Sequence, residues 1–441
     1  MTARWLPLAS LVAIGLLLLL AAGSAALPWL LPEQDATGRR LAAIAIFATS
    51  YLALAVGKVP GLSIDRAGIA LVGACLMVAS RVLSLEEAYH AVDLGTLTLL
   101  LGMMIIVANL RLSGFFALVN AWVVRHVHRP WLLLAAVIAM SGVFSAFLVN
   151  DAICLVMAPL VLELAVALRL NPVPYLLAVA MASNVGSTAT ITGNPQNMMI
   201  GSLSQIPYAQ FTAALAPVAV VGLLATFALL AWLHRADLRQ PIAHADARPV
   251  RIKRMLAARS LVATAAVVAL FFAGQPPAKA AIIVGALLLL TRRVKSTRIY
   301  AEIDWSLLLM FTGLFIIVAG AERELLTPQI VDAVGREHLA SVPVLAGATA
   351  VLSNLVSNVP AVLLLKPFVA VLEDHDRAWL VVAMAATLAG NFTVLGSIAN
   401  LIVVEKAARR GVTIGFWDYF RAGAPLTLLT LLAGTLWLMW R

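Results

Sequence analysis

Apolar runs long enough to cross a lipid bilayer recur along the whole chain, and they constrain its fold more than any other feature. One of them extends from Trp5 to Leu31 without a charged residue. About 20 apolar residues cross the hydrocarbon core as a helix, because a helix satisfies its own backbone hydrogen bonds in lipid. Since 62% of the residues are hydrophobic and only 12% are charged, disorder and a soluble enzyme are excluded. The sequence predicts an all-α polytopic membrane protein.

The apolar runs predict eleven transmembrane helices and two interrupted segments. The spans are expected over residues 6–31, 41–59, 67–83, 94–110, 173–203, 211–233, 259–274, 279–291, 305–321, 378–404 and 422–440. Segments 131–168 and 341–373 are broken near their middle by polar residues, and each half has about 15 residues or slightly more, which is marginal for a full crossing. We expect two re-entrant hairpins there. The run 6–31 is too long for the apolar core of a signal peptide, so we expect an uncleaved helix.

The basic residues predict the orientation of these helices in the membrane. If the loops 235–259, 292–298 and 406–421 are cytoplasmic, 22 of the 31 lysines and arginines fall on the cytoplasmic side. The N-terminus is then cytoplasmic and the C-terminus external, and we expect a bacterial inner (plasma) membrane protein. The formal net charge of +10 is explained by this bias, so we expect no nucleic-acid partner.

Polar, glycine and proline landmarks recur in the same order in the two halves of the chain. The sequence from Asp93 to Ala108 resembles that from Asp304 to Ala319, and Thr190-x-x-Gly-x-x-x-Asn197 matches Thr393-x-x-Gly-x-x-x-Asn400. The charge bias gives the two repeats opposite orientations, which is typical of secondary transporters. After an extra N-terminal helix (residues 1–40), we predict a first repeat over 41–235 and a basic cytoplasmic loop over 236–258. The second repeat is predicted over 259–441. Each repeat holds one hairpin (131–168 or 341–373) and one broken helix (173–203 or 378–404).

Four clusters of small polar residues interrupt the apolar helices, two in each repeat. Glycine and proline within them predict that the helices unwind there. The freed carbonyl and side-chain oxygens can ligate a cation, and the N–H groups of the restarting helices form an anion site. The predicted substrate- or ion-binding residues are Asn150, Asp151, Ser183, Asn184, Gly186, Ser187, Thr188, Thr190, Gly193, Asn194, Asn197, Ser357, Asn358, Asn391, Thr393, Gly396, Ser397 and Asn400.

Two charged residues at the depth of the predicted hairpins are candidates for charge coupling. Asp151 is costly in lipid unless it is paired or hydrated, so it can bind a cation, carry a proton or cap the next helix. A sodium ion at Asn150, Asp151, Ser183 and Asn184 is one possibility. Lys366 can neutralise an anion, pair with an acid or extend to the membrane surface. No cofactor is expected apart from Na⁺ or H⁺ as the coupling ion.

Three segments carry a resemblance to a known group of membrane proteins. SNVGSTATITGNPQN (residues 183–197) resembles a signature of the melanosomal P protein. FLVNDAICLVMAPLV (147–161) resembles the hairpin of arsenite permeases, as GSIANLIV and FWDYFRAGAPLTL resemble their closing segment. The chain is identified as a member of the ion transporter superfamily. That group also includes D-type sodium/proton antiporters and divalent-anion symporters. The resemblance implies a homodimer in which a transport part, formed by the hairpins and the broken helices, moves in an elevator-like manner.

These observations favour an ion-coupled secondary transporter of a small inorganic or organic anion or oxyanion, working by alternating access in the lipid bilayer. A sodium/proton (cation/proton) antiporter is the alternative, because Asp151 and many side-chain oxygens suit a cation. A channel is the third alternative. No paired catalytic motif occurs in the sequence, so we do not expect an enzyme.

Overall fold

The computed structural model describes residues 23, 36–56, 63–240, 253–290, 294–325 and 338–441. Within those ranges every regular element is a helix, and eight helices are long and apolar enough to cross a membrane. The predicted all-α membrane fold is therefore confirmed. The predicted first span, 6–31, and residues 241–252 of the predicted basic loop lie outside the described residues.

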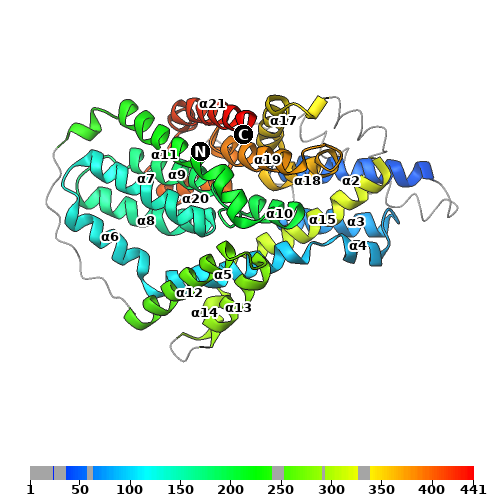
Figure 1. The fold of residues 1–441 in the computed structure, drawn as a ribbon, viewed down its shortest axis with the longest axis horizontal. Helices are drawn as coiled ribbons and strands as arrows, with labels where there is room; N and C mark the ends of the chain where they lie inside the picture. Colours follow the sequence, from blue (N-terminus) through cyan, green and yellow to red (C-terminus); the bar gives the residue numbers. More distant parts are fainter. Residues whose placement is uncertain (1–22, 24–35, 57–62, 241–252, 291–293, 326–337) are drawn as a thin grey trace. The chain divides into compact units, whose positions relative to one another are not determined.

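The chain divides into two compact units (Figure 1), and both units contain parts of both repeats. The first unit draws on residues 1–97, 304–340 and 355–373. Its helices are α2 (Ala36–Val56), α3 (Arg66–Ala79), α4 (Leu85–Ala91), α15 (Trp305–Leu325) and α18 (Asn358–Val369). α15 packs against the other four. A Cβ on Gly313 would lie 2.5 Å from the carbonyl carbon of Ala70, so α3 and α15 touch backbone to backbone.

The second unit draws on residues 98–303, 341–354 and 374–441. Its first helices are α5 (Leu94–Ser113, from Thr98 on), α6 (Phe115–His126), α7 (Pro130–Phe147), α8 (Asn150–Ala167), α9 (Val173–Ser187), α10 (Pro195–Ser204) and α11 (Tyr208–Leu233). Then follow η1 (Asp237–Arg239), α12 (Arg254–Phe272), α13 (Pro277–Leu289), α14 (Ser296–Tyr300) and α17 (Val342–Val356, to Asn354). The last are α19 (His375–Ala389), η3 (Val394–Gly396), α20 (Ile398–Ala408) and α21 (Phe416–Trp440).

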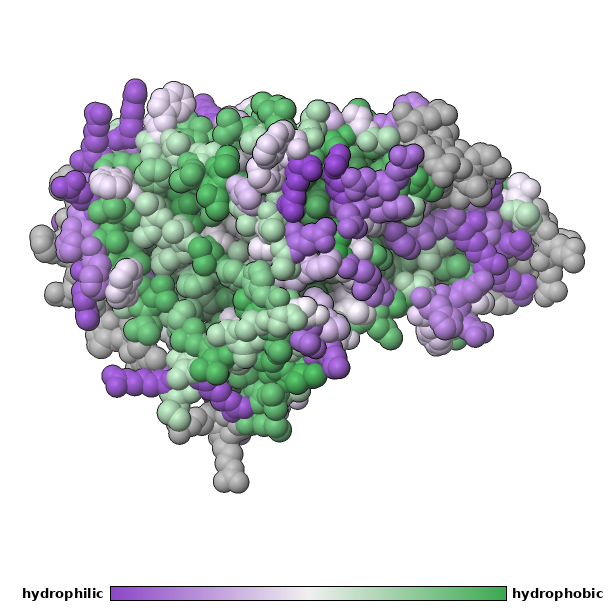
Figure 2. Space-filling view, viewed as in Figure 1, coloured by the Kyte–Doolittle hydropathy of each residue, from purple (hydrophilic) through white to green (hydrophobic). Residues whose placement is uncertain are grey.

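The core of the second unit is the packing of α7, α8 and α20 against α9 (Figure 1). A Cβ on Gly186 of α9 would lie 2.2 Å from the carbonyl oxygen of Gly142 in α7, so only glycine allows this contact. Every residue from Pro174 to Ser187 is buried. The outer helices instead expose large apolar residues such as Leu224 and Val262, and Figure 2 shows apolar side chains spread over a broad face. Apolar exposure on this scale is expected of a surface that faces lipid.

The two predicted hairpins differ in the lengths of their helices. α7 and α8 each have 18 residues and are long and apolar enough to cross a membrane. These lengths are close to the predicted halves of about 15 residues or slightly more, and the re-entrant course of this hairpin stays a prediction. In the second hairpin, α17 has 15 residues and α18 has 12. Here Ser357 separates the two helices with a φ of 79°.

Ion pairs join chain segments that the charge pattern predicts on the same side of the membrane. In the second unit, Arg410 pairs with Glu163 at 2.5 Å and Arg111 with Glu302 at 2.5 Å. Arg410 lies in a loop predicted to be cytoplasmic, and the alternation of the predicted spans puts Glu163, Arg111 and Glu302 on the same side. In the first unit, Arg323 pairs with Glu87, and both lie in segments predicted to be external. The predicted orientation is consistent with these pairs and stays a prediction.

Candidate functional site

Two interrupted helices form the polar centre of the second unit. α9 ends at Ser187 and α10 begins at Pro195, while α19 ends at Ala389 and α20 begins at Ile398. The restarting helices have local caps, since the side chain of Asn194 accepts from the N–H of Asn197 and that of Ser397 accepts from the N–H of Ala399. We call residues 188–194 the first break and residues 390–397 the second break. Both carry residues predicted for the site.

Asn184, at the end of α9, connects the first hairpin to the second break. Its Nδ2 donates to Asn391 Oδ1 (2.9 Å) and to Asn400 Oδ1 (3.0 Å). Its Oδ1 accepts from Asn150 Nδ2 (3.0 Å) and from the hydroxyl of Ser397 (3.2 Å). Asn184 is buried, so these four bonds occupy both of its amide hydrogens and both lone pairs of its oxygen.

A second cluster joins the first break to α19. Asn194 Nδ2 donates to the Thr387 hydroxyl oxygen (3.2 Å) and to Ser187 Oγ (2.9 Å). Gln196 donates to the same Thr387 oxygen (3.3 Å), and the Thr387 hydroxyl donates to Asn197 Oδ1 (3.4 Å). Thr387 was absent from the predicted site. It occupies the position equivalent to Asn184 at the repeat offset of 203 residues, and this offset would have found it.

The two breaks are built alike. Asn197 Nδ2 donates to the carbonyls of Ser187 (3.2 Å) and Thr190 (3.0 Å), which precede it by 10 and 7 residues. Asn400 Nδ2 donates to the carbonyls of Gly390 (2.7 Å) and Thr393 (3.2 Å), again 10 and 7 residues before it. The same side chain therefore closes the unwound turn in both repeats.

The contacts between the breaks are also reciprocal. Asn184 of the first repeat bonds to Ser397 and Asn400 of the second. Thr387 of the second repeat bonds to Asn194 and Asn197 of the first, which are the equivalent positions. Such an exchange of equivalent contacts is the property of a twofold-related pair. It agrees with the inverted-topology repeats inferred from the sequence.

The first hairpin reaches the first break through its tip. The N–H of Asn150 donates to the carbonyl of Gly193 (2.9 Å), while Asn150 Oδ1 is buried without a hydrogen-bond partner. Asp151 is half-buried in the first turn of α8, and the N-cap residue Val149 makes no side-chain cap bond. The unpaired amide oxygen of Asn150 and the adjacent carboxylate of Asp151 are ligands that suit a small cation, whereas the positive end of the α8 dipole opposes one.

The other residues predicted to ligate sodium are already engaged within the protein. Ser183 Oγ donates to the carbonyl of Ala180 (2.8 Å) and lies 2.9 Å from Cys154 Sγ. Both lone pairs of Asn184 Oδ1 are used by Asn150 and Ser397. Over the described ranges, no group of three or more His, Cys, Asp or Glu side chains could hold a metal ion.

The remaining predicted site residues either pack or bond to the backbone within the second unit, or belong to the first unit. Gly186 provides the close approach of α9 to α7. Thr188 Oγ1 donates to the carbonyl of Asn184 (3.2 Å), and Thr190 Oγ1 donates to that of Ala146. Ser357, Asn358 and Lys366 belong to the first unit. Of the four predicted polar clusters, the second unit brings three together: the first hairpin tip and the two breaks.

The hydrogen bonds of this centre come from amides, hydroxyls and backbone groups. In the part of the chain that the structure describes, no lysine, arginine or histidine side chain bonds to Asn150, Asn184, Asn194 or Asn400. An anion bound here would therefore be stabilised by helix N-termini and neutral donors rather than by a cationic side chain.

Known proteins resemble the chain along most of its length. The family described as citrate transporter (CitMHS) matches residues 51–388. A transporter of Mycobacterium tuberculosis is 29% identical over 425 residues, covering 90% of this chain and 98% of its own length. The silicon efflux transporter LSI3 of Oryza sativa subsp. japonica is 28% identical, with 88% and 95% coverage. The solved structure of the Alcanivorax borkumensis YdaH transporter has a TM-score of 0.60 at 15% identity, covers 91% of this chain and 98% of its own, and shares the fold.

Proposed function

The chain belongs to the citrate transporter family and is a membrane transport protein, and we propose that it is an ion-coupled secondary transporter of a small anion or oxyanion. The observation that carries the proposal is the meeting of two helix breaks and a hairpin tip around Asn184. Three helices, α8, α10 and α20, begin at this centre. Their N-termini direct positive ends of peptide dipoles toward it, which suits an anion.

The absence of bonded cationic side chains from the described centre limits the charge of the substrates that it can bind. Burying several negative charges without a cationic partner is expensive. The site therefore favours a singly charged oxyanion or a weak oxyacid, or a more highly charged carboxylate that enters together with a cation. Relatives named for citrate and for silicon fall within this range.

Alternating access is proposed from the repeat. Two breaks with reciprocal contacts give two equivalent arrangements of one chain, which is how inverted repeats produce inward- and outward-open states. We propose that the protein acts as a homodimer and that the broken helices and the first hairpin move together. The coupling ion is Na⁺ or H⁺.

Cation/proton antiport is the second candidate. The unpartnered Asn150 Oδ1 beside Asp151 favours it, because this pair of oxygens could hold a small cation at the start of α8.

Reconstituted vesicles separate these functions. Labelled citrate, silicate, arsenite and sulfate would be offered with imposed sodium or pH gradients. We expect gradient-driven uptake of at least one of these anions, and loss of that uptake in Asn184→Ala. Proton movement that requires a cation and no anion would instead identify an antiporter. Simultaneous labelling of cysteines at the two breaks from both sides of the membrane would identify a channel.

A further inference from the structure

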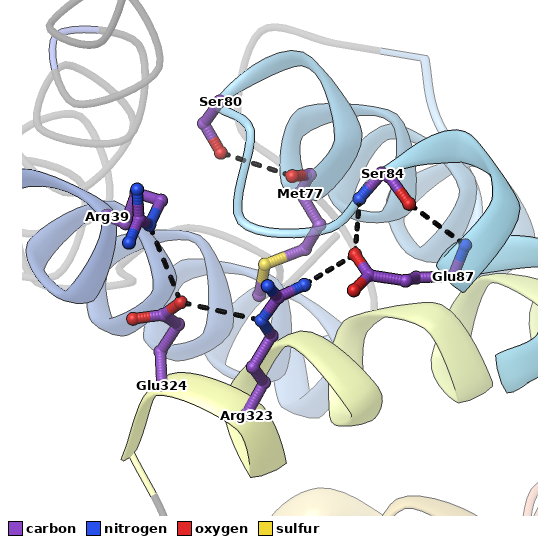
Figure 3. A network of polar contacts seen from close by, with 7 residues as sticks. All are labelled: Arg39, Met77, Ser80, Ser84, Glu87, Arg323 and Glu324. Atoms are coloured by element: carbon purple, nitrogen blue, oxygen red, sulfur yellow. Dashed lines mark hydrogen bonds and ion pairs between the residues drawn. The ribbon is translucent and has the colours of Figure 1, made fainter. Parts of the chain in front are cut away.

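Three consecutive charged residues close α15 in the first unit, and each pairs with a different helix. Arg323 bonds to Glu87 of α4, and Glu324 lies 3.8 Å from Arg39 of α2 (Figure 3). Glu322 Oε2 accepts from Lys366 Nζ of α18 at 3.3 Å. The C-terminal turn of α15 therefore forms ion pairs with three neighbouring helices, α2, α4 and α18.

The Glu322–Lys366 pair differs from the neighbouring ion pairs in two respects: its basic partner is a lysine, and one of its carboxylate oxygens has no hydrogen bond. Among the described residues it is the one ion pair formed by a lysine. Glu322 Oε1 is buried and has no hydrogen-bond partner. A purely structural carboxylate is expected to have both oxygens satisfied, because an unpaired buried oxygen costs stability. The Glu322 side chain is 26% exposed and that of Lys366 is 41% exposed, so neither side chain is enclosed by its unit.

The pair also attaches helix α18 to α15. α18 begins directly after Ser357, whose φ of 79° is unfavourable for a residue with a side chain. Near its start, the carbonyl of Pro360 accepts from the hydroxyl of Tyr51 (3.4 Å), and near its end Lys366 meets Glu322. Polar contacts therefore attach α18 to α2 near its start and to α15 near its end.

We propose that Glu322 is a proton-binding site, in which the proton adds to the unpartnered Oε1 and weakens the attachment of α18 to α15. The inference rests on the proposed function, and it identifies the proton as the coupling ion. In the unprotonated state a carboxylate faces an ammonium group. After the proton adds, Glu322 is a neutral carboxylic acid, Lys366 keeps its charge, and the Coulomb attraction between them is lost.

The surroundings of Glu322 leave few groups that compete for this role. α18 contributes Lys366, and α2 contributes Tyr51, which is within electrostatic range of Glu322. Glu87 of α4 and Arg39 of α2 are engaged by the next two residues of α15. At two of its contacts with α15, α3 contributes uncharged residues, since Gly313 faces Ala70 and Gly320 faces Met77.

Transport in vesicles tests the site with Glu322→Gln and Lys366→Gln, and with Glu324→Gln as the matched control on the same turn. In the wild type and the control, a pH gradient of one unit supports about tenfold accumulation of the anion if one proton is carried. Glu322→Gln is expected to lose accumulation while it retains anion exchange at equal pH. Lys366→Gln is expected to keep accumulation, because the proton binds to Glu322 and not to Lys366.

The two substitutions distinguish a proton site from a structural ion pair. A structural pair predicts that both variants behave alike, and this result would overturn the proposal. So would full pH-driven accumulation by Glu322→Gln.

A spectroscopic readout makes the test independent of the substrate. Infrared difference spectra of the purified protein between acidic and alkaline buffer should contain a carboxylic-acid C=O band. The chain has 21 Asp and Glu residues, so many carboxyl groups contribute to this band; we expect Glu322→Gln to lose one component of it that the wild type and Glu324→Gln retain. An unchanged band in Glu322→Gln refutes proton binding at this residue. If the band behaves as expected but no anion is transported, the proposed function fails and the proton site does not.

Discussion

Replacing Asn184 with alanine removes the side chain on which the two breaks and the first hairpin meet. Four polar groups lose their partner: the amide of Asn150, the hydroxyl of Ser397, and the amide oxygens of Asn391 and Asn400. Each buried group without a partner costs about 1–3 kcal/mol. Water entering the vacated space satisfies part of them, so we expect a loss of about 3–6 kcal/mol in the free energy of unfolding.

Denaturant unfolding in detergent measures this loss, with Thr226→Val as the matched control. Thr226 is equally buried, but its hydroxyl donates only to the carbonyl of Gly222 within α11, so its replacement should cost about 1 kcal/mol or less. A double-mutant cycle between Asn184 and Asn400 should give a coupling energy of about 0.5–3 kcal/mol. If Asn184→Ala is no more destabilising than the control, the central role assigned to this side chain is wrong.

Further predictions concern the repeat and the surface charges. Gly193→Ala should destabilise more than Gly396→Ala in thermal unfolding, because the nearest backbone oxygen would lie 2.2 Å from the first new Cβ and 2.8 Å from the second; equal effects would contradict the reasoning. The backbone N–H of Ser84 leads the contacts that lower the pKa of the Glu87 carboxyl. Its stabilising contribution is therefore present above the unfolded pKa of about 4.3 and is lost as the pH falls through the lower folded value. Melting temperatures measured over a pH series should fall less steeply at acidic pH in Glu87→Gln than in the wild type. An equally steep fall would contradict the role assigned to Glu87. Glu163→Gln, in an exposed ion pair, should cost about 1 kcal/mol or less and leave uptake intact; a large loss of uptake would show that the pair does more than hold two helix ends.

The sequence was sufficient for those parts of the fold that depend on local chemistry. Gly193 and Pro195 predict an unwound segment, and the structure has non-helical backbone from Thr188 to Asn194, between α9 and α10. Apolar runs of about 20 residues predict spans in the same way, and α11 and α21 correspond to two of them. These features need only the nearest residues along the chain.

Features that depend on distant residues were not predictable in the same way. Nothing in the residues around Lys366 identifies Glu322, 44 positions away, as its partner. Thr387 carries a common side chain, and only the repeat offset of 203 residues, which makes it equivalent to Asn184, singles it out. The short helix α6 was missed because Phe115–His126 is too short to be recognised as a span.

The reciprocal bonding of the two breaks also has a consequence for biosynthesis. The amide hydrogens of Asn184 find their acceptors 207 and 216 residues later in the chain. At a translation rate of about 5–20 residues per second, the ribosome needs about 10–40 s to make that stretch. Throughout this interval the first repeat is already long enough to enter the bilayer, while its polar centre has no permanent partners. A nascent first half must therefore stay hydrated or be shielded by the insertion machinery until the second half arrives.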